Sequence, residues 1–108
     1  MRRLLALLAL GSSCFALDNA IRIYDASGSA QSSRPFTVLM IFVKGEFPTG
    51  TYPKPRVGGT VPSAWQVDVK SRWPDGSILS AFVSFPVSLS ANGNVRVDFV
   101  PDSNPCHL

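Results

Sequence analysis

Residues 64–73 read AWQVDVKSRW, a segment in which apolar and polar side chains alternate almost without interruption. Successive side chains of an extended chain point to opposite sides, so this alternation predicts a β-strand with one dry face and one wet face. The predicted dry face carries Trp65, Val67, Val69 and Trp73, and the wet face carries Gln66, Asp68, Lys70 and Arg72. Such a strand is typical of an antiparallel sheet with one face in a core.

The end of this strand predicts a tight hairpin, formed by Arg72, Trp73, Pro74, Asp75 and Gly76. Pro74 presets its own φ, the Asp75 carboxylate can accept a backbone N–H, and Gly76 can adopt the left-handed conformation. A return strand is expected over residues 77–85, with apolar side chains on both faces.

Four more strands are expected around this hairpin, over residues 20–24, 36–43, 87–89 and 95–100. The run at 36–43 is almost continuously apolar, which predicts a strand buried on both sides. Pro86 is expected to mark a bend or a departure from central pairing. Asn92-Gly93 predicts a second hairpin, which joins 87–89 to 95–100.

Prolines and glycines recur every few residues and are densest between residues 47 and 62. Because proline cannot donate to a strand ladder, this segment predicts a long ordered loop with one edge strand. Gly58-Gly59 is interpreted as a turn, since no helix start or Lys-Ser/Thr pair follows it. No window of 11 residues or more shows helical spacing of apolar residues. The chain is therefore expected to be all-β, as a small closed antiparallel barrel or a two-layer sandwich.

The length and composition limit the chain to one small domain. Its 108 residues are 45% apolar and 16% charged, which excludes disorder driven by charge. The longest unbroken apolar run, residues 4–10, has seven residues, against about 20 for a membrane-spanning helix.

Residues 1–16 have the three parts of a secretory signal peptide: a positive start, a short apolar segment and a small-residue exit. Cleavage at that exit leaves a module over residues 17–108, exported to the periplasm or outside the cell. A lipoprotein anchor at Cys14 is the less favoured alternative, because Gly11 stands where a branched aliphatic residue is usual. Loss of the leader lowers the basic count from 10 to 8 against 7 acidic residues, a net charge of +1. A nucleic-acid binder is therefore not expected.

The candidate catalytic residues all have plainer interpretations. His107 is the single histidine in the sequence, and with Cys106 it makes two ligands where zinc needs three or four. Neither a metal nor a cofactor is expected, and Cys106 is either a spare thiol or paired with a cysteine beyond this sequence. The residues considered and set aside for catalysis are Lys44, Tyr52, Lys54, Arg56, Asp68 and Asp75, with Ser80, Ser84 and Ser88 interpreted as surface serines. No catalytic residue is assigned, and the chain is not expected to be an enzyme.

Sugar binding is the activity that the aromatic residues favour, since sugars are held by aromatic faces flanked by hydrogen-bonding side chains. The candidates are Tyr52, Trp65 and Trp73. Tyr52 lies in the 47–62 segment and is expected to be exposed, whereas both tryptophans lie on the predicted dry face, where core packing is favoured.

Four segments resemble the N-terminal module of bacterial exo-rhamnogalacturonan-lyase-like secreted proteins. They are residues 33–36 (SRPF), 42–47 (FVKGEF), 65–70 (WQVDVK) and, most distinctively, 72–78 (RWPDGSI). The resemblance spans residues 34–89, roughly half of the sequence. It implies a small β-barrel that precedes a much larger catalytic region in a pectin-degrading, lyase-like protein.

These observations lead us to expect an exported, noncatalytic β-module that packs against or positions a catalytic domain of a carbohydrate-active protein. One alternative is a free-standing carbohydrate-binding module that uses Tyr52 and the 47–62 segment. Another is a structural or adhesive β-domain of an extracellular or phage-derived assembly.

Overall fold

The structure, a computed structural model, describes residues 19–107. The predicted signal peptide at 1–16 and its Cys14 lie outside the described residues. Within them the chain forms the strands β1 (Ala20–Tyr24), β2 (Gln31–Ile41), β3 (Tyr52–Val57), β4 (Trp65–Arg72), β5 (Ile78–Leu89), β6 (Asn94–Asp102) and β7 (Cys106–His107). The all-β prediction is confirmed, and no helix of the described part is long and apolar enough to cross a membrane.

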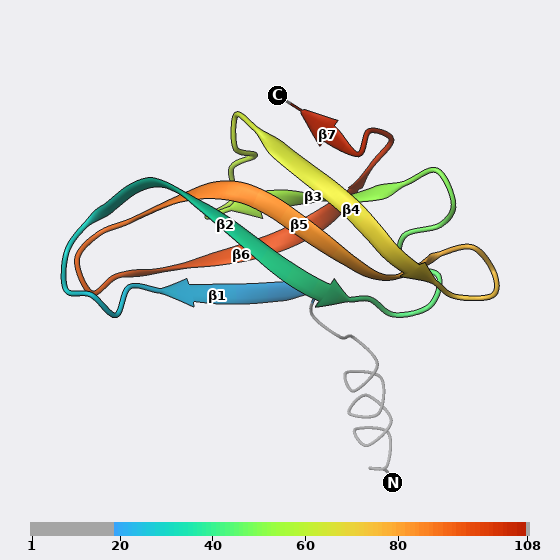
Figure 1. The fold of residues 1–108 in the computed structure, drawn as a ribbon, viewed down its shortest axis with the longest axis horizontal. Helices are drawn as coiled ribbons and strands as arrows, with labels where there is room; N and C mark the ends of the chain where they lie inside the picture. The colour runs from blue at the N-terminus through green and yellow to red at the C-terminus, as the bar shows by residue number, and fades with distance from the viewer. Residues whose placement is uncertain (1–18, 108) are drawn as a thin grey trace, which may run out of the picture.

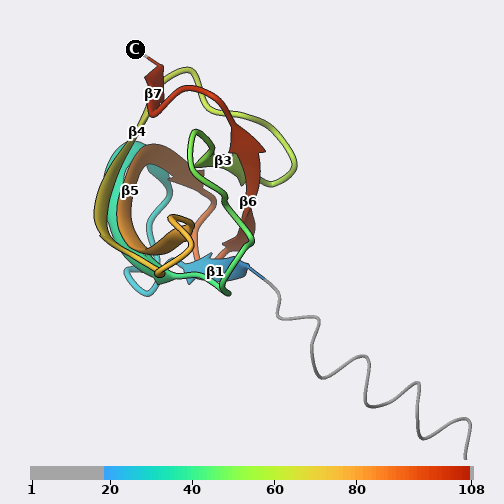
Figure 2. The ribbon, with the colours of Figure 1, turned by 90° about the vertical axis from the view of Figure 1, so that its right-hand side faces the viewer.

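The strands form two antiparallel sheets that face each other. One sheet has three strands in the order β1-β6-β3, and the other has four in the order β2-β5-β4-β7. Figure 1 shows β2, β5 and β4 crossing over β6, and Figure 2 shows the two layers from the end of the molecule. No strand of residues 19–107 belongs to both sheets, so the closed-barrel alternative is wrong and the fold is a two-layer sandwich.

The β4–β5 hairpin has the predicted turn chemistry. Gly76 has a φ of +91°, and its N–H donates to the carbonyl of Trp73 at 2.8 Å. The Asp75 carboxylate accepts the Ser77 N–H at 2.9 Å and the Ser77 hydroxyl at 2.5 Å. Burial along β4 alternates as predicted, with Trp65 and Val67 buried and the polar residues of the wet face exposed.

The predicted second hairpin is wrong, although its turn is present. Asn92 adopts a φ of +57°, and the Gly93 N–H donates to the Ser90 carbonyl at 2.8 Å. However, β5 and β6 do not pair, because β6 lies in the three-stranded sheet between β1 and β3. The turn therefore carries the chain from one layer to the other. Turn residues determine where a chain reverses, whereas the pairing partner is decided by which faces are buried.

Two predicted strands, 77–85 and 87–89, are one continuous strand, β5. Pro86 lies within it and pairs with Pro35 of β2. The last pair between β5 and β4 is Ser84 with Gln66, so Pro86 has no strand on its β4 side. The predicted departure from central pairing is confirmed, and it occurs without breaking the strand, because a proline is tolerated where no ladder hydrogen bond is required.

The 47–62 segment contains one edge strand, as predicted. This strand is β3, which pairs with β6 alone and buries Pro53 and Pro55. An edge position suits proline, whose missing N–H costs nothing on the unpaired side. Gly58 and Gly59 form the turn that follows, with φ values of +60° and +87°.

The core lies between the sheets and is dominated by phenylalanine rings. Phe99 of β6 packs edge-on against Phe42 and Phe85 of the opposite layer, with ring centroids 6.1 and 6.4 Å apart. Phe47, from the loop after β2, packs edge-on against Phe42, with ring centroids 4.7 Å apart, and is fully buried. The remaining buried apolar residues are Ile23, Met40, Trp65, Val67, Ile78, Ala81, Val83, Val87 and Val97.

The prediction that 36–43 is buried on both sides is wrong. In β2, Met40 is buried, but Leu39 is 49% exposed and Ile41 is 63% exposed. The physical reason is the number of layers. A two-layer sandwich buries only one face of each sheet, and among residues 19–107 no third layer covers the outer face of β2.

Replacement of Gly76 tests the hairpin. Gly76→Val should lower the free energy of unfolding by about 2–4 kcal/mol, because a β-branched residue is strained at positive φ. A Cβ at this position also meets the Thr49 hydroxyl. Gly76→Asn meets the same hydroxyl but tolerates positive φ better, so it should cost less. Urea denaturation measures the free energy of unfolding of both variants. Equal, small losses would mean that the turn is wrongly placed.

Candidate functional site

The three aromatic residues considered for sugar binding do not share one surface. Tyr52 lies at the start of β3, is half-buried and packs against the core. Trp65 begins β4 and is 4% exposed, and Trp73 follows the other end of the same strand. An eight-residue strand is about 26 Å long, so the two indoles cannot hold one sugar ring.

Trp73 anchors the hairpin to the chain that follows β2. Its indole Nε1 donates a hydrogen bond to the Phe42 carbonyl at 3.1 Å. Beside it, Arg72 donates from Nη1 to the Gly76 carbonyl at 2.7 Å. The Arg72 contact joins the two sides of the turn, and the Trp73 contact joins the hairpin to the chain that follows β2. Trp73 is half-buried, so it belongs to the border of the core and does not form a free binding face.

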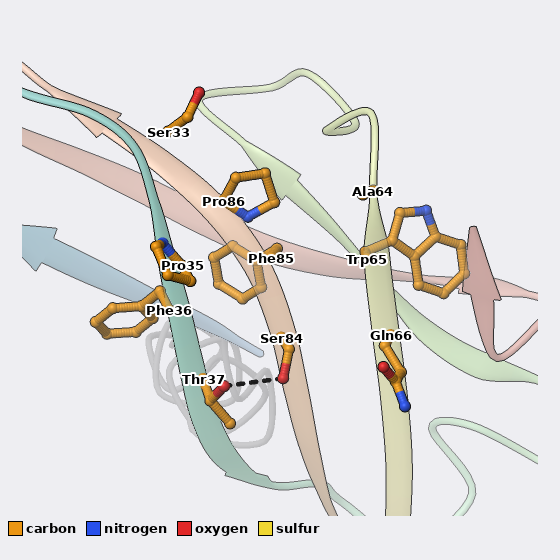
Figure 3. A pocket seen from close by; sticks show the side chains of 10 residues that line it. All are labelled: Ser33, Pro35, Phe36, Thr37, Ala64, Trp65, Gln66, Ser84, Phe85 and Pro86. Carbon is orange, nitrogen blue, oxygen red and sulfur yellow. Dashed lines mark hydrogen bonds between the residues drawn. The ribbon is translucent and has the colours of Figure 1, made fainter. Parts of the chain in front are cut away.

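A hollow of about 300 Å³ opens where β4 and β5 separate, and Figure 3 shows the side chains around it. Its apolar side is formed by Pro35, Phe36, Phe85 and Pro86. Its polar rim carries Thr37, Ser84 and Gln66, and the Thr37 and Ser84 hydroxyls are bonded to each other at 2.9 Å. Trp65 borders this hollow, but Figure 3 shows its indole on the side of β4 away from Phe85. An apolar wall with a hydroxyl and amide rim is suited to a small ligand of mixed polarity.

A second, more polar hollow of about 400 Å³ lies beside Trp65 and β7. Its charged residues are Lys54 and Asp102, which form an ion pair at 3.3 Å. Cys106 and His107 also line it, because β7 pairs with the beginning of β4. Trp65 and His107 are thus neighbours, although no short-range spacing in the sequence connects them. Within residues 19–107, no three His, Cys, Asp or Glu side chains gather in a way that could hold a metal ion, and Cys106 is a free, exposed thiol.

The cationic residues considered for catalysis face carboxylates or solvent. Arg56 and Asp98 are register partners on β3 and β6, and the Arg56 Nε lies 3.1 Å from the Asp98 carboxylate. This hydrogen bond lowers the pKa of Asp98 and raises the pKa of Arg56. Lys44 is exposed in the turn after β2. A guanidinium held by a carboxylate supports the pairing of β3 with β6.

The serines of β5 differ from one another. Ser84 is half-buried, and Ser88 is exposed and accepts the Ser33 N–H at 2.9 Å. Ser80, predicted to be at the surface, is buried and shares a 2.5 Å hydrogen bond with the Ser71 hydroxyl. The irregular register of β4 around Ser71 brings these two hydroxyls together, and a buried polar group needs such a partner.

The outer side of the four-stranded sheet carries an apolar surface that the sequence analysis missed. Leu39 and Phe82 are register partners on β2 and β5, and Ile41 is next on the same side of β2. Leu39, Ile41, Val43 and Phe82 are 49%, 63%, 40% and 37% exposed, and we call them the outer apolar face. Lys70 lies over the Phe82 ring, with its Nζ 5.8 Å from the centroid. Contiguous exposed apolar residues mark interaction surfaces in soluble proteins.

Comparison of the chain with protein-family models, curated proteins and solved structures found no match.

The Arg56–Asp98 pair predicts a pH-dependent contribution to stability. The folded-state pKa of Asp98 is lowered, so its contribution is present above the unfolded pKa and is lost as the pH falls through the folded pKa. Asp98→Asn should therefore destabilise the protein by about 0.5–1 kcal/mol at pH 7, a small value because the pair is solvent-screened. The difference between the two proteins should shrink as the pH falls below about 3.9, the usual pKa of an aspartate, and should be lost once Asp98 is protonated in the folded state as well. A difference that does not change with pH would contradict this account.

Proposed function

We propose that the chain is an exported, noncatalytic β-module that packs against and positions a catalytic domain of a carbohydrate-active, lyase-like protein. The observation that supports this proposal best is the outer apolar face. Its residues lie on the outside of the sandwich, so they add little to the core. Removing Leu39 and Phe82 from water on contact with another domain would gain about 25 cal/mol for each Å² buried.

The charges of the module fit the same proposal. The two cationic residues of β3 that were considered for catalysis, Lys54 and Arg56, form ion pairs with carboxylates of β6. The hydrogen-bonded carboxylate of the hairpin, Asp75, is held by Ser77, and its pKa is lowered as a result. These groups serve the fold. The outer apolar face, in contrast, is only partly covered within the described residues, by Lys70 over the Phe82 ring, and the proposal assigns the catalytic domain to it.

The test uses the catalytic region of a rhamnogalacturonan-lyase-like protein, produced without its own N-terminal module, as the partner. The double variant Ile41→Thr/Phe82→Thr should weaken its complex with this chain at least about 10-fold, because central apolar contacts supply most of an interface's binding energy. Threonine keeps the strand preference, so the free energy of unfolding should change by only about 1 kcal/mol. Isothermal titration calorimetry measures the affinities.

Val61→Thr is the matched control, because Val61 is 40% exposed but lies away from the outer apolar face. It should bind the partner as the unchanged chain does. Equal affinities for the double variant and the unchanged chain, or no complex with either, would refute the proposal.

A further inference from the structure

A third hollow, of about 350 Å³, lies between the edges of the two sheets, where β1 ends and β2 begins. Its apolar walls are Ile23, Phe36, Val87 and Leu89. Tyr24 stands at its margin and is 67% exposed, more than any other large hydrophobic side chain of the described residues. The volume is within the range of small-molecule sites, about 300–1,000 Å³.

Arg34 enters this hollow in a held orientation. The register between β2 and β5 shifts between Gln31 and Arg34, and such a bulge redirects the side chains near it. The Arg34 Nε donates to the Gln31 Oε1 at 2.7 Å. Gln31 is held in turn, because its Nε2 donates to the Ser27 hydroxyl at 3.0 Å and to the Ser29 carbonyl at 3.1 Å. One nitrogen of the guanidinium is thus engaged, whereas Nη1 and Nη2 have no partner among residues 19–107.

The Asp25 carboxylate, which also lines the hollow, is already occupied by hydrogen bonds. Asp25 Oδ1 accepts the Ser27 N–H at 3.0 Å and the Ser27 hydroxyl at 2.6 Å, and Oδ2 accepts the Asn92 N–H at 2.8 Å. These hydrogen bonds, led by that of the Ser27 hydroxyl, lower the pKa of Asp25. No carboxylate of the described residues forms an ion pair with Arg34. The groups of the hollow that remain free to bind a ligand are therefore mainly hydrogen-bond donors, and they lie beside an apolar wall.

We infer that this hollow binds a ring compound that carries a carboxylate. The two free nitrogens of Arg34 match the two oxygens of a carboxylate, which is the arrangement in which arginine binds most strongly. The exposed Tyr24 ring and the apolar walls offer surfaces to the face of a sugar or aromatic ring. The inference concerns a different surface from the outer apolar face and does not rest on the domain-packing proposal.

The test is a titration of the isotope-labelled chain, followed by NMR chemical shifts, with D-glucuronate, benzoate and D-glucose as probes. Glucuronate or benzoate should shift the amide signals of residues 23–25, 31–34 and 36. Arg34→Gln should weaken this binding at least about 5-fold, because it removes a charge-assisted contact at a partly exposed site. Arg34→Lys should be intermediate, since lysine keeps the charge without the fork.

Lys44→Gln is the matched control, because it removes one positive charge from an exposed position in the turn after β2, which does not line the hollow. It should leave binding unchanged. Binding of glucuronate alone would identify a sugar acid as the ligand class, and binding of benzoate alone an aromatic acid. The inference is overturned if neither acid shifts these signals, if glucose binds as tightly as glucuronate, or if Arg34→Gln and Lys44→Gln have equal effects.

Discussion

The contact between Phe99 and the rings of Phe42 and Phe85 is the constraint on which the sandwich depends. Phe99 comes from the three-stranded sheet and the other two from the opposite layer, so these edge-on contacts join the sheets directly. Phe47 and Phe36 extend the cluster on either side. A domain of this size has a thin margin of stability, and aromatic rings supply more buried apolar area than any other side chains. With this interface dry, recognition is left to the outer faces of the sheets and to their edges.

Local features of the sequence were sufficient for part of this fold. The alternation at 65–72 and the residues of the Pro74-Asp75-Gly76 turn act over a few positions, and the hairpin has the predicted form. Asn92-Gly93 also turns as predicted, but the strands on its two sides belong to different sheets. That outcome depends on pairing between β6 and the distant β1 and β3, for which a local turn signal carries no information.

The binding surfaces were harder to predict, for two physical reasons. An apolar run such as 36–43 is compatible with burial on one side or on both, and only the number of layers decides between them. The hollow that Arg34 lines brings Tyr24 of β1 beside Arg34 of β2. These are edge strands of different sheets, and no short-range spacing in the sequence connects the two residues. The proline-rich surroundings of Tyr52 predict an exposed side chain, yet in β3 this side chain packs against the core.

Chemical denaturation of two phenylalanine variants tests the sandwich most directly. Phe99 is 3% exposed and Phe82 is 37% exposed, so the account assigns one to the closed interior and the other to the outer face. Phe99→Ala should lower the free energy of unfolding by about 3–5 kcal/mol, and Phe82→Ala by about 1 kcal/mol or less. Equal losses for the two variants, or a larger loss for Phe82→Ala, would contradict the proposed packing of the two sheets.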